Sequence, residues 1–293
     1  MEGDRAMNLL EVKGLSKSYE HFKLQEISFS LPKGYVMGCV GQNGAGKTTT
    51  INLITNLCNG EQGELRIDGI TYEENPQNYK EKIGYIGDES YFPREFKIKD
   101  IRAVMRSMYG SFQVEKFDQM VKKWKLPEKQ KIREFSRGMK VKLMFATVLS
   151  RDTRLLILDE ATNGLDPLMR EEILQLLQTY IEDGEHSIFF STHLLMDLEQ
   201  IADYIVFLHH GKVLMDAAKD DMLESFLLIK GDGNSLTEEQ QKSLMGITEG
   251  AYGFTALIKT NDAILFDHQF VKERPTIDQI MIHVIKNEER QGN

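Results

Sequence analysis

The chain is 293 residues long, which is enough to bury a large core and suggests one large domain, alone or with a smaller second one. Hydrophobic residues make up 41% and charged residues 28%, values that exclude disordered and fibrous classes of protein. The net charge of -9 argues against a general attraction to nucleic acid or to an anionic membrane surface. We therefore expect no nucleic-acid partner.

The sequence indicates a cytoplasmic location. Its two cysteines, Cys39 and Cys58, both lie in apolar stretches, which is typical of packing residues in a reducing compartment. The first residues do not resemble a secretory signal, and no run approaches the roughly 18 apolar residues of a membrane-spanning helix. Any role at a membrane is therefore expected to involve separate subunits.

The first part of the chain predicts strands, then a loop, then a helix. Apolar residues partly alternate over residues 9–32, which indicates short antiparallel strands. A continuous apolar run at residues 35–40 predicts a buried strand that leads into a glycine-rich loop. Residues 47–57 then have helical spacing.

The middle of the chain predicts a helical subdomain and further buried strands. Residues 100–149 carry helical patterns interrupted at Gly110 and Pro127, so we expect an inserted helical subdomain over about residues 88–149. Short apolar strands are expected at residues 155–158 and 187–191, with a helix between them. Strands that alternate with helices predict a mostly parallel sheet, here with an antiparallel β layer at the N-terminal end.

The end of the chain predicts a separate small unit. The pattern weakens after residues 205–208, and residues 255–259 and 263–266 are strand candidates that precede a final helix. We expect a main domain over residues 1–226 and a small C-terminal α+β accessory domain over residues 227–293.

A phosphate-binding loop is predicted at residues 41–48, which read GQNGAGKT and match the pattern G-x-x-x-x-G-K-[ST]. Glycines let backbone N–H groups point at phosphate oxygens, Lys47 reaches the outer phosphates, and the Thr48 hydroxyl is suited to Mg²⁺. The candidate ATP-binding residues are Asn43, Gly44, Ala45, Gly46, Lys47, Thr48 and Thr49.

Two adjacent carboxylates end the predicted strand at residues 155–158. Asp159 is a candidate ligand of Mg²⁺, and Glu160 is a candidate to polarise the water that attacks the terminal phosphate. Acids at this position can instead cap the following helix.

These motifs resemble those of ATP-binding cassette (ABC) proteins. Residues 159–167, DEATNGLDP, are similar to the second acidic motif and the following loop of that family, and residues 136–140, SRGMK, stand where the family carries its signature sequence. His193 and Tyr19 occupy the places of the switch histidine and the adenine-stacking aromatic. The resemblance covers about residues 10–216.

The resemblance implies roles for these residues. It makes Glu160, His193 and Lys47 catalytic, and it places Tyr19 against adenine, although Tyr19 can also be an ordinary strand aromatic. The resemblance also implies that two chains hold two ATP molecules between them. It makes Ser136, Gly138 and Asp166 further cofactor-binding residues, because they lie in the family motifs of such a pair of chains. Ser136 can cap its helix at the same time, and His193 can be a neighbour of a helix cap.

The sequence departs from the family pattern at three positions. Arg137 and Met139 stand in place of Gly and Gln, a form of the signature that resembles some bacterial drug and peptide exporters. Asp88 stands in place of a glutamine that contacts magnesium, so both a metal contact and a plain loop-surface role are open.

An aromatic cluster follows Asp88, formed by Tyr91, Phe92, Pro93 and Phe96. It can fill the core beneath a loop, or it can form a groove that receives a short helix of a transmembrane partner.

The resemblance implies an ATP-binding and ATP-hydrolysing subunit of an ABC transporter, most consistent with an exporter, that uses ATP and Mg²⁺. Such a subunit forms a homodimer, or a heterodimer with a second nucleotide-binding subunit, and works with transmembrane permease subunits on the inner face of the cell membrane. One alternative is a soluble regulatory or mechanical ATPase of the same family, which acts on ribosomes or chromosomes. Another is a phosphoryl-transferring kinase, whose site is complete in one chain.

Overall fold

The computed structural model describes residues 7–192, 194–250 and 253–291. The chain divides into two compact units, Met1–Asp216 and Ala217–Asn293, so the division falls at residue 216 and not at the expected residue 226. The reason is that helix α8, Lys219–Ser225, packs within the second unit. There the Thr260 hydroxyl donates a hydrogen bond of 2.5 Å to the Glu224 carbonyl oxygen.

The first unit begins with a three-stranded antiparallel sheet. Its strand order is β2-β1-β4, with bounds β1 Asn8–Tyr19, β2 Phe22–Pro32 and β4 Gln62–Ile67. Apolar side chains of this sheet pack towards the second sheet of the unit, and Phe29 stacks on Phe189 with ring centroids 5.7 Å apart. The antiparallel layer and the central sheet therefore share one core.

The central sheet of the first unit has six strands in the order β5-β6-β7-β3-β8-β9. The bounds are β3 Val36–Val40, β5 Ile83–Ile86, β6 Leu155–Asp159, β7 Ser187–Ser191, β8 Tyr204–His209 and β9 Lys212–Ala218. The first five strands in that order are parallel. Buried on both faces, they form from continuous apolar runs, and their carboxyl ends meet at one edge.

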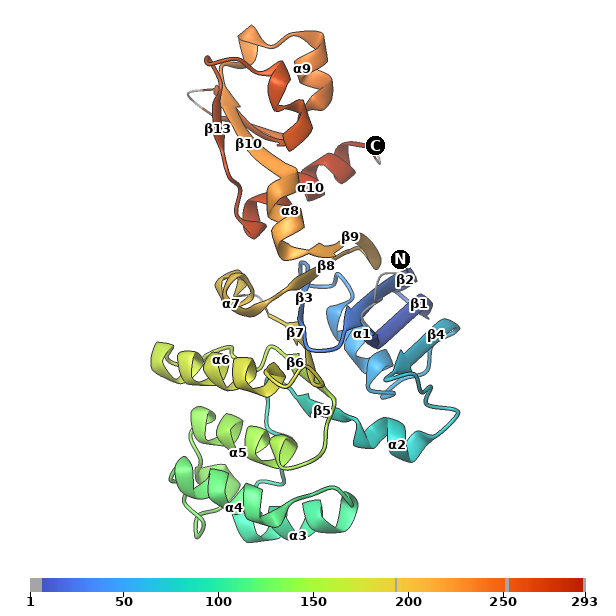
Figure 1. The fold of residues 1–293 in the computed structure, drawn as a ribbon, viewed down its shortest axis with the longest axis vertical. Helices are drawn as coiled ribbons and strands as arrows, with labels where there is room; N and C mark the ends of the chain where they lie inside the picture. The colour runs from blue at the N-terminus through green and yellow to red at the C-terminus, as the bar shows by residue number, and fades with distance from the viewer. Residues whose placement is uncertain (1–6, 193, 251–252, 292–293) are drawn as a thin grey trace. The chain divides into compact units, whose positions relative to one another are not determined.

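The helices of the first unit fall into two groups (Figure 1). One group accompanies the central sheet, with bounds α1 Lys47–Ile54, α2 Pro76–Glu81, α6 Pro167–Ile181 and α7 Leu195–Ile201. The other lies between β5 and β6 in the sequence, with bounds α3 Ile98–Met108, α4 Val114–Lys123, η1 Ile132–Glu134 and α5 Arg137–Leu149. We call this second group the helical subdomain. Phe117 of α4 and Phe145 of α5 are fully buried, which gives the subdomain its own apolar packing.

The second unit is built on a four-stranded antiparallel sheet of order β11-β12-β10-β13. The bounds are β10 Phe226–Gly231, η2 Gly233–Ser235, α9 Glu238–Ser243, β11 Met245–Gly250, β12 Gly253–Lys259, η3 Thr260–Leu265, β13 Val271–Glu273 and α10 Ile277–Gln291. The predicted strand at residues 255–259 lies in β12. The prediction of a strand at residues 263–266 is wrong, because most of that segment belongs to η3.

The expected fold class is confirmed: a mostly parallel sheet carries an antiparallel β layer, a group of helices inserted between β5 and β6, and an α+β unit at the C-terminal end. No described helix is both long and apolar enough to cross a membrane.

Candidate nucleotide-binding site

The phosphate loop connects β3 to α1 at the carboxyl edge of the central sheet. All five residues of β3 are buried, and the strand pairs with β7 on one side and β8 on the other. The central position of β3 therefore fixes where the loop leaves the sheet. This edge is the usual ligand-binding edge of a parallel sheet.

Glycine is required at two positions of the loop. Gly46 is the N-cap of α1 with φ of 114°, a left-handed conformation that residues with a side chain rarely adopt. A Cβ atom at Gly41 would lie 2.4 Å from the Leu208 carbonyl oxygen. The close approach of the loop to the end of β8 thus excludes any side chain at residue 41.

Lys47 is held over the loop by the loop's own carbonyl groups. Its Nζ donates hydrogen bonds to the carbonyl oxygens of Gly41, at 2.6 Å, and Gln42, at 3.2 Å. The residue is only 6% exposed. The ammonium group is therefore prepositioned beside the N-terminus of α1, where an anion is favoured.

A pocket of about 510 Å³ surrounds this loop. That volume lies within the range usual for small-molecule sites. Most of the predicted ATP-binding residues line it, together with Glu160, with Gln42 of the predicted loop, and with two residues that the sequence did not suggest, His21 and Phe22. The lining residues are Tyr19, His21, Phe22, Gln42, Asn43, Gly44, Gly46, Lys47, Thr48, Thr49 and Glu160.

Tyr19 lies at the end of β1 with its side chain half exposed, in the wall of this pocket. Its hydroxyl donates to Cys58 Sγ at 3.8 Å, and this hydrogen bond is the main cause of a raised Tyr19 pKa. The contact anchors one end of the ring, Lys17 Nζ lies 5.7 Å from the ring centre, and the rest of the half-exposed ring borders the pocket. The ring is thus available for stacking.

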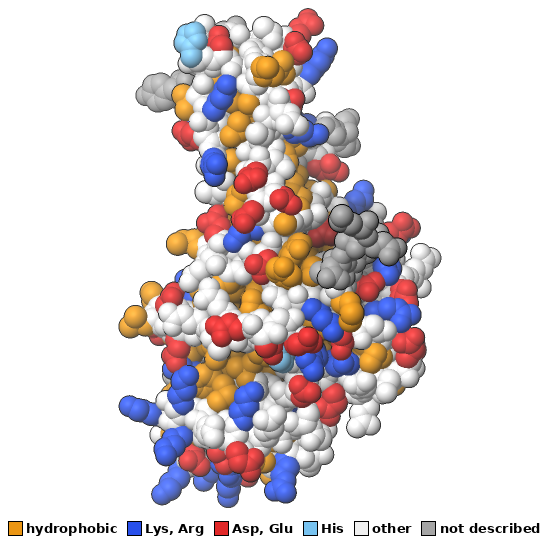
Figure 2. All heavy atoms as spheres, in the orientation of Figure 1, with side chains coloured by type: hydrophobic (Ala, Val, Ile, Leu, Met, Phe, Trp, Pro, Cys, Tyr) orange, Lys and Arg blue, Asp and Glu red, His pale blue; other side chains and the backbone are white. Residues whose placement is uncertain are grey.

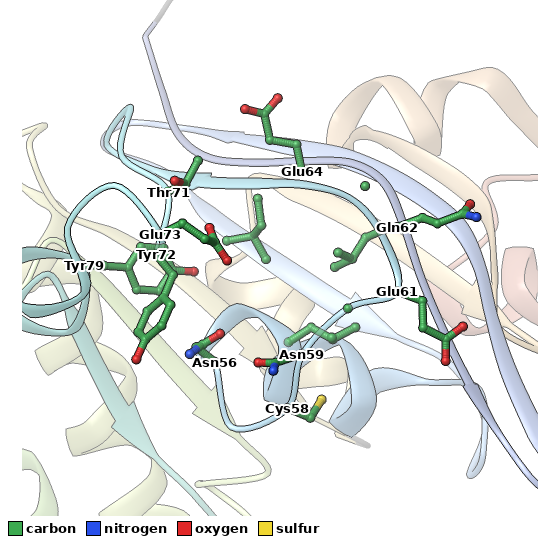
Figure 3. Close-up of a pocket in the computed structure, with 15 residues that line it drawn as sticks. Asn56, Cys58, Asn59, Glu61, Gln62, Glu64, Thr71, Tyr72, Glu73 and Tyr79 are labelled. Atoms are coloured by element: carbon green, nitrogen blue, oxygen red, sulfur yellow. The ribbon is translucent and has the colours of Figure 1, made fainter.

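A separate pocket of about 240 Å³ lies beside the C-terminal end of α1 (Figure 3). Asn56, Cys58, Glu61, Tyr72 and Tyr79 are among its lining residues, and the phosphate loop contributes none of them. Its acidic side chains make it unsuited to a triphosphate.

Asp159 and Glu160 stand at the carboxyl end of β6, as the sequence predicts. Burial of the carboxyl group, together with the negative charge of Glu160, raises the pKa of Asp159 above its ordinary value. A cation beside this carboxylate would relieve that cost. The arrangement is therefore suited to binding one.

Glu160 has φ of 55°, which turns the chain sharply where β6 ends. Its backbone N–H donates to the Ser191 carbonyl oxygen at 2.8 Å. The side-chain amide of Asn163 donates to Glu160 Oε2, also at 2.8 Å. This contribution of Asn163 was not predicted, and the spacing of three residues between Glu160 and Asn163 is the only signal of it in the sequence.

The residues predicted to serve a second subunit lie outside the 510 Å³ pocket. Ser136 caps α5, and its Oγ accepts a hydrogen bond from the Met139 N–H at 3.2 Å. Asp166 caps α6 in the same way, with the Met169 N–H at 3.0 Å. Gly138 lies in the first turn of α5. Ala45 belongs to the loop but is buried, and His193 falls outside the described residues.

Asp88, the candidate third magnesium ligand, follows β5 and forms an ion pair with Arg137 at the start of α5. Both side chains are partly exposed, 48% for Asp88 and 45% for Arg137. Neither residue lines the 510 Å³ pocket.

Comparison with known proteins identifies the family. Residues 24–163 match the family model for ABC transporters. The chain is 35% identical over 211 residues to the bacitracin transport ATP-binding protein BcrA of Enterococcus faecalis, covering 70% of this chain and 68% of the relative. It is 32% identical over 215 residues to the lantibiotic transport ATP-binding protein SrtF of Streptococcus pyogenes, covering 72% and 92%.

A solved structure described as the ATP-binding subunit of an ABC transporter is similar to 73% of this chain, with 29% identity and a TM-score of 0.68, and the match covers 91% of that structure. The chain belongs to the ABC transporter family, of which it is an ATP-binding subunit with the fold and motifs of an ATPase.

Proposed function

We propose that the chain is the ATPase subunit of an exporter, in which two nucleotide-binding subunits close on ATP and thereby move separate transmembrane permease subunits. The observation that carries this proposal is the shared pocket of Tyr19, Lys47 and Glu160, together with Ser136 and Gly138 at a different surface. A second copy would supply the missing signature contacts.

In this proposal different residues of the chain bind the base, bind the phosphates and activate the attacking water. Tyr19 stacks on the base, and the loop N–H groups and Lys47 hold the phosphates. Glu160 accepts a proton from the attacking water while Asn163 keeps its carboxylate in place. His193, which is outside the described residues, is proposed to contact the terminal phosphate.

Magnesium fits the donors at this edge of the sheet. The Thr48 hydroxyl and the Asp159 carboxylate are hard oxygen ligands, and the burial and the Glu160 charge that raise the pKa of Asp159 are costs that a bound cation would offset. Among the described residues no group of three or more His, Cys, Asp or Glu side chains could hold a metal by itself. This agrees with an ion bound largely by phosphate oxygens and water, where it would neutralise developing charge during phosphoryl transfer.

A groove of about 310 Å³ is the proposed contact with a permease subunit on the inner face of the membrane. Tyr91 lies in it with half its surface exposed, whereas Phe92 is buried, so the aromatic cluster supports both a groove and a core. The Arg151 guanidinium lies 3.5 Å from the centre of the Tyr109 ring and stiffens one wall. The groove-lining residues are Thr55, Leu57, Lys80, Ile83, Tyr85, Tyr91, Met105, Tyr109, Val148 and Arg151.

The direction of transport is inferred from the relatives and the signature. Two relatives are named for bacitracin transport and lantibiotic transport, and the signature SRGMK resembles that of exporters. On the face drawn in Figure 2, basic and acidic side chains of the described residues are interspersed, which does not favour an alternative function on nucleic acid.

The test is light scattering of the wild type and the Glu160→Gln variant, each with and without Mg-ATP, together with steady-state ATPase assays. We expect Glu160→Gln to bind ATP, to form a stable dimer and to lose at least about a hundredfold in turnover. Glu182→Gln, a change of the same kind at an exposed residue of the C-terminal end of α6, should behave as the wild type. A Glu160→Gln monomer with near-normal turnover would refute the proposal.

The partner is tested by co-purification of membrane subunits with the tagged chain. Tyr91→Ala should reduce their recovery without changing ATP-dependent dimerisation, because Tyr91 lines the groove and not the phosphate pocket. Tyr72→Ala, in the pocket of Figure 3, is the matched control. Equal recovery with both variants would exclude this groove as the contact.

A further inference from the structure

Two of the positions at which this sequence departs from the family pattern are brought together in the fold. Asp88 lies two residues after the end of β5, and Arg137 is the first residue of α5, 49 positions later. Their side chains form a hydrogen-bonded ion pair. A glutamine at residue 88 and a glycine at residue 137 could not form such a pair, so the two departures are physically linked.

Arg137 also contacts the loop that follows Glu160. A methyl group built on Gly164 would lie 3.1 Å from Arg137 Cζ and 3.2 Å from its Nε, so the guanidinium lies directly against the Gly164 backbone. One side chain of the helical subdomain thus touches two loops that leave the central sheet, one after β5 and one after β6. A movement of Arg137 would therefore change its contacts with both loops.

The pair lies in a pocket of about 400 Å³ that contains other charges. Arg94, Arg133 and Lys140 also line it, and Glu89 is a second acid. Arg133 forms its ion pair with Glu95, at 2.7 Å. Asp88 is therefore paired selectively with Arg137 although several cations are near. Because both side chains are partly exposed, another anion can replace Asp88 at a small cost.

Asp88 is close enough to the acidic strand end to influence it. Its negative charge is one of the contributions that raise the pKa of Asp159, after burial and the charge of Glu160. When neutralised by Arg137, Asp88 attracts a cation at that strand end less strongly than a bare carboxylate would.

We propose that Arg137 is a positioning residue. In the single chain its ion pair keeps Asp88 from contacting magnesium, and Arg137 releases Asp88 when the triphosphate bound by a second subunit reaches the start of α5. The inference rests on the proposed ATP-bound dimer. A triphosphate carries more charge than one carboxylate and meets the N-terminus of α5, so it displaces Asp88 from Arg137. Each site then gains its magnesium ligand only when the opposite site holds ATP.

The experiment is a double-mutant cycle in the Glu160→Gln background, with Mg²⁺ titrated against ATP binding at concentrations where the chain is monomeric. Arg137→Gln should lower the Mg²⁺ midpoint about two- to fivefold, the scale of an exposed ion pair. Asp88→Asn alone should change it little, and the double variant should match Asp88→Asn. Arg133→Gln removes the same charge from the same pocket and should cause no shift.

The second measurement is the ATP concentration that half-saturates dimerisation, which Arg137→Gln should raise about two- to fivefold because the phosphate loses this partner. Additive effects of Arg137→Gln and Asp88→Asn on the Mg²⁺ midpoint, or equal effects of Arg137→Gln and Arg133→Gln, would overturn the inference. So would an unchanged ATP midpoint. Failure of the parent Glu160→Gln chain to dimerise would instead refute the proposed function.

Discussion

Glu172 links the helical subdomain to α6, the helix that comes after the loop following Glu160. It lies on α6, its Oε1 accepts a hydrogen bond from the Trp124 indole N–H at 2.8 Å, and its Oε2 pairs with Lys142 Nζ, also at 2.8 Å. Trp124 follows α4, and Lys142 is on α5. We predict that Glu172→Ala loosens this junction.

The magnitude follows from burial. Trp124 is 9% exposed, so its indole N–H left without an acceptor costs about 1–3 kcal/mol. The Glu172 side chain is 42% exposed, so solvent reduces the value of its ion pair to about 0.2–1 kcal/mol. Glu172→Ala should lower the free energy of unfolding by about 1–3 kcal/mol. Glu172→Gln keeps an acceptor for the indole and should cost less than about 1 kcal/mol.

The effect of Glu172 also depends on pH. Burial acts to raise the pKa of its carboxyl group, but the hydrogen bond and charge of Lys142 and the Trp124 indole outweigh burial, so the pKa is lowered. A carboxyl group with a lowered folded-state pKa stabilises the fold fully above its unfolded pKa, about 4.3. The difference between wild type and Glu172→Gln should therefore persist at pH 7 and shrink as the pH falls below about 4.

Urea unfolding followed by tryptophan fluorescence measures this directly, because Trp124 is the chain's single tryptophan. Glu182→Ala, at the exposed C-cap residue of the same helix, is the control. If Glu172→Ala unfolds at the same urea concentration as that control, or if Glu172→Gln costs as much as Glu172→Ala, the indole hydrogen bond does not stabilise the junction.

Three further predictions concern other parts of the chain. Gly41→Ala places a methyl group 2.4 Å from the Leu208 carbonyl oxygen, so it should lower the free energy of unfolding by about 1–3 kcal/mol. It should also abolish binding of a fluorescent ATP analogue, and retained binding would contradict the crowding argument. Tyr19→Ala should weaken ATP binding at least about fivefold in calorimetry, since stacking on a base contributes about 1–3 kcal/mol. Tyr19→Phe keeps the ring and should bind as the wild type does. Equal affinities of Tyr19→Ala and the wild type would show that Tyr19 does not contact the base. Burial lowers the pKa of His283, so stability of the second unit should fall as the pH drops below the unfolded value of about 6.5. His283→Gln should flatten this dependence in urea unfolding, and an unchanged slope would show that another group causes it.

Much of the site was predictable because its signals are local. The apolar run of β3, the glycines and Lys47 are contiguous, and so are β6, Asp159 and Glu160. The parallel sheet then brings the two segments to one edge. The small unit was harder to predict, because a short strand and a 3-10 helix carry little periodicity. Residues 263–266 illustrate this, since they form the end of η3 and its C-cap.

The fold class, the phosphate loop and the paired acids can be read from the amino-acid sequence, since each depends on neighbouring residues and on strand and helix periodicity. Which distant charges meet depends instead on how the helices and strands pack. In the same pocket Glu89 is a second acid for Arg137, and Arg94, Arg133 and Lys140 are other cations for Asp88. The packing of α5 against β5 places the start of α5 near the carboxyl end of β5 and so selects that one pair. This selection depends on the packing of the helical subdomain and not on the spacing of the residues along the chain.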